Sequence, residues 1–316
     1  MQFNGAQGSI SAMPPSDTDR ERLQQGPPGL VGSHLTVQQQ GGSLAVHQPV
    51  VIIGMGELGD TFARGFLRCG YPVYPILRGT DPAAVADLLP APELVLVAVA
   101  EKDLDPVLAA LPASWRSHLA LLQNELLPRD WERHGIAEPT IAVVWFDKKK
   151  GRPFVALQPT VVFGPKAERI VRTLAAIELP CQPVAAGQGL YELVRKNLYI
   201  LTVNLCGIVT GGTAGELWAD HRQLALEAAQ EILVIQQHLA AEALPRERLL
   251  ASLAADIAAD PQHICRGRSA AERLQRALRH AEAAGIATPR LRRIGGHADA
   301  AAETGSLRET AGTGNP

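Results

Sequence analysis

The fold is decided by the stretch Pro49-Val50-Val51-Ile52-Ile53-Gly54-Met55-Gly56-Glu57-Leu58-Gly59-Asp60-Thr61-Phe62-Ala63-Arg64, in which an apolar run enters a glycine-spaced turn and then an amphipathic segment. A strand, a G-x-G-x-x-G turn and a helix in this order are typical of a dinucleotide-binding unit. Gly54 permits the tight turn, Gly56 lets a phosphate approach the backbone, and Gly59 lets the helix pack on its strand. Free N–H groups at the helix start then face the anion. We predict a pyrophosphate site formed by Gly54, Met55, Gly56, Glu57, Leu58 and Gly59. The alternative is a glycine-rich turn that binds no ligand.

The end of the next predicted strand, residues 71–78, indicates which nucleotide is bound. An acidic residue about twenty positions after the glycines would accept hydrogen bonds from a ribose 2′-hydroxyl. This chain has Arg78-Gly79-Thr80 there, and a guanidinium suits a 2′-phosphate. The sequence therefore favours NADP (NADPH) over NAD, with Arg78 at the phosphate. Two alternatives stay open: Arg78 is an ordinary solvated charge, or Asp81 faces the ribose.

The pattern of strands and helices predicts an α/β fold. Apolar runs at 71–78, 93–100 and 119–122 alternate with helical patterns at 81–89 and 104–111. This order is typical of a Rossmann-type doubly wound parallel sheet with right-handed crossovers. Strand patterns at 140–145 and 160–163 follow without a helix between them and predict an antiparallel extension, with a turn around 148–152. A helix is expected over 167–177.

The last part of the chain is predicted to be all-helical. Apolar residues recur at helical spacing over 190–209, 224–243, 246–258 and 270–284, and Gly285 and Pro289 follow as stop signals. We therefore divide the chain into a flexible leader (1–47), a dinucleotide-binding domain (48–164), a helical substrate and dimerisation domain (165–293) and a flexible tail (294–316). Small substrates usually bind in clefts between such domains.

Composition excludes several classes of protein. The net charge is −2 over 316 residues with no basic stripe, which argues against a nucleic-acid partner. No apolar run is long enough for a membrane span and no signal pattern is present, so a cytoplasmic location is expected. The run Lys148-Lys149-Lys150 reads as a solvated loop, or as a charge that attracts an anionic substrate. No metal site is predicted, because the chain has four cysteines without metal-ligand or disulfide spacing: Cys69, Cys181, Cys206 and Cys265.

Two polar residues of the predicted helix 190–209 are candidates for chemistry. Lys196 and Asn204 are eight positions apart, slightly more than two turns, so both project along one side of the helix. A polar group on an apolar helix must meet a partner or a wet cleft. The alternative is that Lys196 is a surface charge and Asn204 a satisfied polar residue within the helical bundle.

With these features the chain resembles the ketopantoate reductase family. The resemblance is carried, in order, by the glycine turn 54–59, Leu77-Arg78, Gln123-Asn124, the helix with Lys196 and Asn204, Gly215-Glu216-Leu217, and Gly285-Ile286-Ala287-Thr288-Pro289. It implies a helical domain like that of 6-phosphogluconate dehydrogenase. It also implies NADPH-dependent reduction of a small 2-keto acid or related carbonyl compound, with Lys196 as general acid. Asn204 would then bind the substrate, and Asn124 would lie near both nicotinamide and substrate.

The chain also departs from the family pattern. Ile200 stands where the family has a second asparagine, Ala100 where it has a lysine, and Glu125 where its Gln-Asn segment ends in glycine. The segment 264–272 lacks the family's Ser-Ser-Met, Glu and Asn-Gly residues, and Glu272 aligns with the acid only through a deletion. Arg266 and Arg268 could recognise another carboxylate, or belong to a solvated loop.

Three functions therefore stay open. The first is the keto-acid reductase. The second is a non-catalytic NADP-binding sensor or partner protein, which the missing polar residues favour. The third is a hydroxy-acid or sugar-phosphate dehydrogenase of related architecture. The partner expected in each case is a small molecule, and a homodimer is left open because helical domains of this kind often dimerise.

Overall fold

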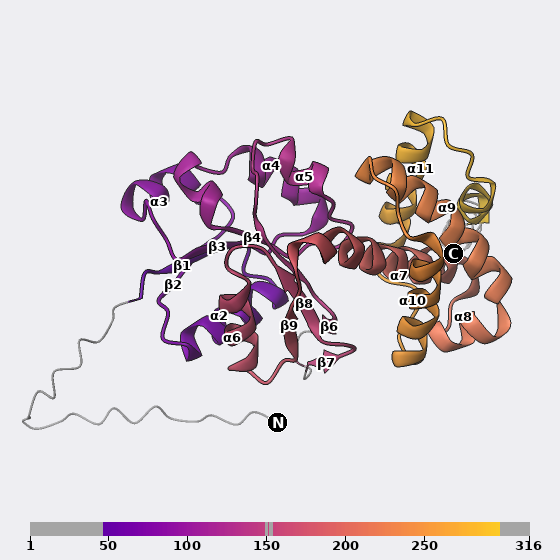
Figure 1. Cartoon of the computed structure of the whole chain (residues 1–316), viewed down its shortest axis with the longest axis horizontal. Coiled ribbons are helices and arrows are strands. Elements are labelled where there is room, and N and C mark those ends of the chain that lie inside the picture. The colour runs from indigo at the N-terminus through magenta and orange to yellow at the C-terminus, as the bar shows by residue number, and fades with distance from the viewer. Residues whose placement is uncertain (1–46, 149–150, 152–153, 298–316) are drawn as a thin grey trace, which may run out of the picture. The chain divides into compact units, whose positions relative to one another are not determined.

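A seven-stranded sheet forms the core of the N-terminal half (Figure 1). The computed structural model describes residues 47–148, 151 and 154–297. The strand order is β2-β1-β3-β4-β5-β8-β9. The strands are β1 (Val50–Ile53), β2 (Val73–Ile76), β3 (Leu94–Val97), β4 (Leu119–Leu121), β5 (Thr140–Val143), β8 (Thr160–Phe163) and β9 (Cys181–Pro183). The first five are parallel and β8 is antiparallel to β5, which confirms the predicted doubly wound sheet and its antiparallel extension.

Helices cover both faces of this sheet. Helices α2 (Glu57–Arg68) and α6 (Ala167–Ala175) lie on one face, and α3 (Pro82–Leu88) and α4 (Leu104–Ala109) lie on the other (Figure 1). Successive side chains of β1 therefore enter different cores, and all four are buried. Burial on both faces explains why this strand is a continuous apolar run without alternation. A short helix, α5 (Pro128–Glu132), follows β4.

The sheet extends beyond the domain boundary predicted at residue 164. Strand β9 pairs with β8, and α6 packs against α2, so residues up to Pro183 belong with the sheet. Strand β9 gave no signal because it is three residues long, includes proline and is largely exposed. A second small sheet, β6 (Phe146–Asp147) with β7 (Val155–Ala156), flanks the predicted turn, of which Lys149 and Lys150 lie outside the described residues.

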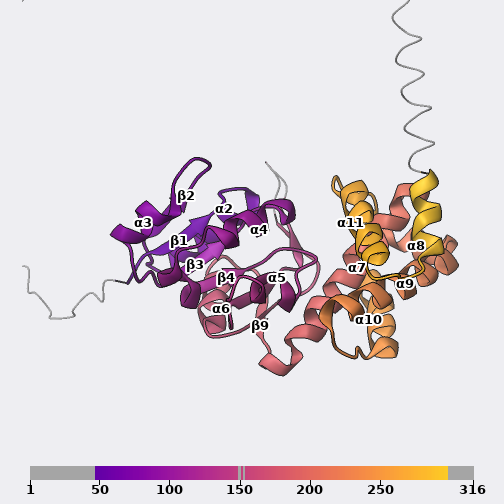
Figure 2. The same cartoon turned by 90° about the horizontal axis from the view of Figure 1, so that it is seen from above.

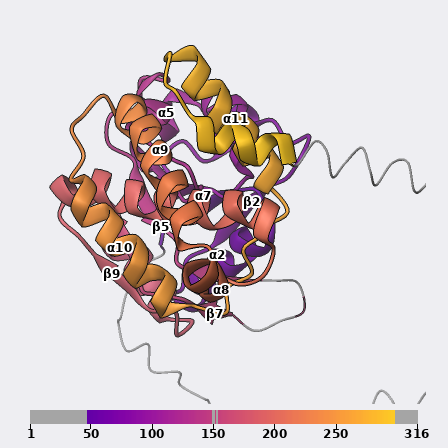
Figure 3. The same cartoon turned by 90° about the vertical axis from the view of Figure 1, so that its right-hand side faces the viewer.

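The C-terminal half is helical, as predicted, and is organised around α7 (Gly189–Thr210). Helices α9 (Arg222–Ala240), α10 (Arg246–Ala259) and α11 (Ala270–Ala283) all pack against α7 (Figures 2 and 3). The sequence did not predict α8 (Ala214–Asp220), which begins with a capping box between Thr213 and Glu216. One core cluster runs from the α3 and α4 face of the sheet into these helices, so the two halves share apolar contacts.

The structure describes only small parts of the predicted leader and tail. Residues 289–297 are helical, so the predicted tail from residue 294 begins inside a helix. The rest of that tail, and the predicted leader apart from His47, lie outside the described residues. Within the described ranges no helix is long and apolar enough to cross a membrane. No group of three or more His, Cys, Asp or Glu side chains is placed there to hold a metal ion.

Candidate active site

The glycine turn has the geometry expected of a pyrophosphate cradle. Gly54 has a φ of +96°, a left-handed conformation, and a Cβ there would lie 3.0 Å from the carbonyl oxygen of Ala98. A Cβ on Gly59 would lie 2.0 Å from the carbonyl oxygen of Gly54, because α2 packs directly on the turn. A Cβ on Gly56 would meet no atom within 4 Å. The open side of the turn is therefore at Gly56, where the sequence predicts that a phosphate binds.

The start of α2 leaves backbone donors for an anion. Gly56 is the N-cap and no side chain caps the helix. The helix dipole adds partial positive charge at this end. Lys148 Nζ lies 3.7 Å from a carboxylate oxygen of Glu57, so one cation from the predicted basic run is next to the first turn. These observations fit a dinucleotide pyrophosphate.

Arg78 lies in the turn that follows β2. Its side chain is exposed, and it forms no hydrogen bond or ion pair with any other described residue. Asp81, the alternative ribose acceptor, is the N-cap of α3 and accepts a hydrogen bond of 3.0 Å from the backbone N–H of Ala83. The guanidinium is thus free to meet an anion, whereas the carboxylate already has a structural role.

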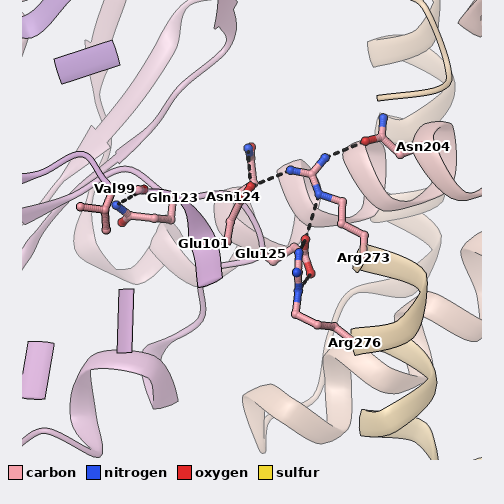
Figure 4. A network of polar contacts seen from close by, with 8 residues as sticks. All are labelled: Val99, Glu101, Gln123, Asn124, Glu125, Asn204, Arg273 and Arg276. Carbon is pink, nitrogen blue, oxygen red and sulfur yellow. Dashed lines mark hydrogen bonds and ion pairs between the residues drawn. The ribbon is translucent and has the colours of Figure 1, made fainter. Parts of the chain in front are cut away.

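Polar side chains gather where β3 and β4 end. Gln123 is buried, and its Nε2 donates to the carbonyl oxygen of Val97 at 2.8 Å. The same nitrogen donates to the carbonyl oxygen of Val99 at 3.2 Å (Figure 4), so Gln123 ties the two strand ends together. Asn124 follows, and its Nδ2 donates to Glu101 Oε1 at 3.2 Å. Glu101 begins a 3-10 turn, η1 (Glu101–Asp103). Asn124 is therefore held at the sheet edge where ligands of such folds collect.

Lys196 is buried on α7, which excludes the alternative of a surface charge. The residue is 8% exposed and its Nζ lies 4.1 Å from the centroid of the Trp145 ring. Among the described residues, none accepts a hydrogen bond from this amine. Burial and the charge of Arg273 lower the pKa of Lys196 to about 7, although Asp256 and Asp147 act in the opposite direction. The amine therefore exists in both protonation states near neutral pH.

Asn204 is also buried, and its amide already has partners on both sides. Its Oδ1 accepts a hydrogen bond of 2.6 Å from Arg273 Nη1, and its Nδ2 donates to the carbonyl oxygen of Cys265 at 3.1 Å. These contacts match the alternative of a satisfied polar residue within the bundle. An amide oxygen has two lone pairs, so Oδ1 retains capacity for one more donor.

Arg273 is the centre of what we call the buried ion cluster, formed by Glu101, Glu125, Asn204, Arg273 and Arg276 (Figure 4). Arg273 is 6% exposed. Its Nη2 donates to Glu101 at 2.6 Å, and its Nε donates to Glu125 at 2.9 Å. Among the described residues, Arg276 pairs with Glu125 alone. Burial opposes ionisation of Glu101, but the charge of Arg273 and several hydrogen bonds outweigh it and lower the pKa of Glu101.

Glu125 occupies the family's glycine position and keeps a glycine-like backbone. Its φ is +63°, a value that residues other than glycine and asparagine rarely adopt. The two arginines hold its carboxylate while the backbone stays in this strained conformation. Strain of this kind costs about 1–3 kcal/mol and persists only where surrounding contacts fix it.

Sequence reasoning missed Arg273 and Glu101. The signal for Arg273 was its register on α11, because it shares the buried side with Ala270, Leu274 and Ala277. A charged residue at a core position must be paired. The other candidates from this region stay outside the cluster, since the side chains of Glu272, Arg266 and Arg268 are exposed.

A cavity of about 210 Å³ lies beside Asn124. Its walls include Glu101 and Asn124 from the sheet edge, Leu201 from α7, Ile232 from α9 and Ala277 from α11. Lys196 does not line it. The structure therefore joins Asn124 to Asn204 through Glu101 and Arg273, whereas Lys196 lies next to Trp145 on another side of α7.

Comparison with solved structures shows which proteins share this fold. A ketopantoate reductase from Ralstonia eutropha is 18% identical, with a TM-score of 0.57 over 79% of this chain and 96% of its own. A dimeric ketopantoate reductase from Staphylococcus aureus is 17% identical, with a TM-score of 0.56 over 80% and 98%. A D-mandelate dehydrogenase bound to NADH is 15% identical, with a TM-score of 0.59 over 81% and 99%.

The sequence comparisons add no closer relative. No protein-family model matches the chain, and no curated protein matches it. At these identities the structural likeness concerns the fold. The chain therefore has the fold of the ketopantoate reductases, which confirms the resemblance at that level and the predicted Rossmann-type sheet with a helical C-terminal part.

Proposed function

We propose that this chain is an NADPH-dependent reductase of a small 2-keto acid or related carbonyl compound, with Lys196 as the general acid. The observation that carries the proposal is the state of the Lys196 amine. It is buried, it lacks a hydrogen-bond acceptor among the described residues, and its pKa is lowered to about 7. A general acid works best when its pKa is near the working pH.

The cofactor proposal rests on the glycine turn. The open space at Gly56 and the uncapped start of α2 fit a pyrophosphate, held by residues Gly54, Met55, Gly56, Glu57, Leu58 and Gly59. The unpartnered guanidinium of Arg78 supports NADP rather than NAD. A bound nicotinamide would supply the hydride, and the remaining chemistry would belong to the protein.

That chemistry is the handling of charge on the carbonyl oxygen. When a hydride reaches carbon, negative charge develops on oxygen, and an ammonium nearby stabilises it and donates a proton. The Trp145 ring centroid lies 4.1 Å from Lys196 Nζ, and a cation–π contact of this kind favours the charged form of the amine. Asn124 is the proposed contact near nicotinamide and substrate, and the free lone pair of Asn204 Oδ1 is a second proposed contact.

The test is oxidation of NADPH in the presence of a panel of 2-keto acids. We expect turnover of at least one compound, and Lys196→Ala should lower kcat about a hundredfold or more, the usual effect of losing a positioned acid. Lys102→Ala, which removes an exposed lysine, is the matched control and should leave kcat unchanged. An equal kcat for Lys196→Ala and the unmodified protein would overturn the role of Lys196.

A second function is favoured by specific observations. Ile200 stands where the ketopantoate reductase family has an asparagine, and the amide of Asn204 is engaged within the protein. Both fit a non-catalytic NADP-binding sensor or partner protein. If NADPH binds but no carbonyl compound of the panel is reduced, this second function is the correct one.

A further inference from the structure

We propose that the cavity beside Asn124 binds a small uncharged molecule with an apolar body, about the size of one aromatic ring, and one oxygen that accepts a hydrogen bond from Gln236. Lys196, the residue proposed as general acid, does not line this cavity. Binding in the cavity is therefore independent of the proposed reduction of a 2-keto acid.

The walls of the cavity are largely apolar and come from both halves of the described chain. Buried apolar side chains from α4, the segment after β4, α7, α9 and α11 form them, among them Leu104, Leu126, Leu201, Ile232, Ile235 and Ala277. An apolar cavity of about 150 Å³ takes up a benzene molecule. The cavity beside Asn124 has a volume of about 210 Å³, so it has room for one such ring with a short substituent.

Gln236 on α9 is the buried polar group that gives the cavity chemical selectivity. It lines the cavity and is 4% exposed. Its Oε1 accepts a hydrogen bond of 3.0 Å from Asn197 Nδ2, which also donates to the carbonyl oxygen of Leu126 at 3.2 Å. Among the described residues, none accepts a hydrogen bond from Gln236 Nε2. A buried amide donor requires an acceptor, and an oxygen atom of the ligand would supply it.

The charged side chains of the lining favour an uncharged ligand, because most of them are already paired. Arg276 pairs with Glu125, and Arg133 pairs with Asp105 at 2.8 Å. Arg129 forms no ion pair with any other described residue, but it is exposed, and exposed ion pairs contribute little to binding. A charged ligand in the apolar interior would lose its hydration without gaining an ionic partner.

The cavity and the Lys196 amine lie on different sides of α7. Leu201 lines the cavity and comes five positions after Lys196, which corresponds to about 140° around the helix axis. Lys196 Nζ instead lies over the ring of Trp145, a residue that does not line the cavity. A ligand bound in the cavity therefore does not contact the amine.

Exposed side chains mark the opening of the cavity. Arg129, Arg133 and His280 line it and are exposed to solvent, whereas Gln236 and the apolar walls are buried. The cavity therefore opens to solvent at the side where these three residues lie, which gives a small molecule a path to the apolar interior.

The experiment is an NMR titration of three probes with the full chain, in the absence of a nicotinamide cofactor so that no reduction occurs. Acetophenone has a ring and a carbonyl oxygen, α-methylstyrene has a methylene group in place of that oxygen, and benzoate has a carboxylate. We expect acetophenone to bind with a Kd of about 1 mM or lower. Benzoate should bind at least about tenfold more weakly than acetophenone, because its charge would be buried without a partner.

Four variants locate the bound probe. Gln236→Met keeps the length of the side chain and removes the donor, so it should weaken acetophenone about fivefold and change α-methylstyrene less than about twofold. Ala277→Leu fills the cavity and should weaken both probes at least about tenfold, which keeps the test decisive if Gln236→Met does not fold. Ala271→Leu, at an exposed position of the same helix, is the matched control and should change neither affinity. Lys196→Ala should also leave both affinities unchanged.

Several results would overturn the site. Acetophenone that does not bind the unmodified protein, or that binds Ala277→Leu equally well, excludes the cavity as its place of binding. Equal weakening of acetophenone and α-methylstyrene by Gln236→Met excludes the amide as the hydrogen-bond donor, and benzoate that binds more tightly than acetophenone excludes an uncharged ligand. Weaker binding to Lys196→Ala would mean that the probe lies at the proposed reductase centre. Because no readout involves oxidation of NADPH, failure of the proposed reduction would leave all these results unchanged.

Discussion

The glycine turn leaves backbone donors without a side-chain cap, whereas the buried ion cluster pairs its charged side chains with one another. The turn is built from consecutive residues, acts through backbone N–H groups and leaves an open side at Gly56. The cluster takes side chains from η1, the turn that follows β4, α7 and α11, and its charges pair with one another. The turn therefore has an open side at which a ligand would need no rearrangement, whereas the charges of the cluster are already paired with one another.

The packing side of the turn should be the most sensitive position. Gly59→Ala would place a Cβ 2.0 Å from the carbonyl oxygen of Gly54, which is backbone and cannot move aside cheaply. We expect the free energy of unfolding to fall by about 3 kcal/mol, as for overpacking of a close contact. Urea denaturation measures this change. A loss of less than about 0.5 kcal/mol, the range of ordinary surface substitutions, would mean that α2 does not pack on the turn so closely.

The cluster should lose stability when its charge balance is removed. Glu125→Gln keeps the side-chain shape but leaves Arg273 and Arg276 with one carboxylate fewer. Hydrogen bonds to charged groups contribute about 1.5–3 kcal/mol, so we expect a loss of about 2 kcal/mol in unfolding free energy. Glu132→Gln, an exposed glutamate, is the control and should change stability by less than about 0.5 kcal/mol. Equal effects of the two substitutions would show that the cluster is not a stabilising network.

The open side of the turn should separate binding from folding. In Gly56→Ala the new Cβ meets no protein atom within 4 Å, so it faces the space proposed for the pyrophosphate. We expect the Kd for NADPH to rise about tenfold, or ~1.4 kcal/mol. Stability should fall by less than about 1 kcal/mol, because alanine is a poorer N-cap than glycine. Unchanged NADPH affinity, measured by fluorescence titration, would remove the case for a phosphate at Gly56.

The smallest effect is expected at Arg78, because its contact with a 2′-phosphate would be exposed to solvent. Arg78→Ala should raise the Kd for NADPH about fivefold, which corresponds to ~1 kcal/mol for an exposed ion pair. The Kd for NADH should stay the same. High salt should shrink the difference, because it screens exposed charges. Equal weakening of both cofactors would assign Arg78 a role other than recognition of the phosphate.

A feature could be predicted from the sequence where the contacts that fix it are local. The run from Val50 to Arg68 was predicted because each requirement is local: a buried strand, a turn with glycine at fixed spacing and an amphipathic helix. Strand β9 was missed because it is short and exposed, and its place is fixed only by pairing with β8. Helix α8 was missed because its signal is a capping box in seven residues rather than a sustained apolar period.

The candidate site was predicted only in part, because its side chains pair across distant segments of the chain. The sequence singled out Lys196 and Asn204 as polar residues of one apolar helix, but it did not reveal the partner of either residue. The partner of Asn204 is Arg273, sixty-nine positions further along the chain. The departure at Glu125 was visible in the sequence, yet its meaning required the two arginines that hold it. Pairing between distant segments is a property of the folded chain and has no local pattern.

The most direct measurement is the pH dependence of kcat/KM for reduction of a 2-keto acid, since this ratio reports the pKa of the essential acid in the free enzyme. Lys196 must be protonated to donate, and its pKa is lowered to about 7. We expect kcat/KM to be constant at low pH and to fall tenfold per pH unit above about pH 7, while the reverse oxidation rises over the same range. A reduction rate that stays flat from about pH 6 to about pH 9 would contradict the assignment of Lys196 as the proton donor.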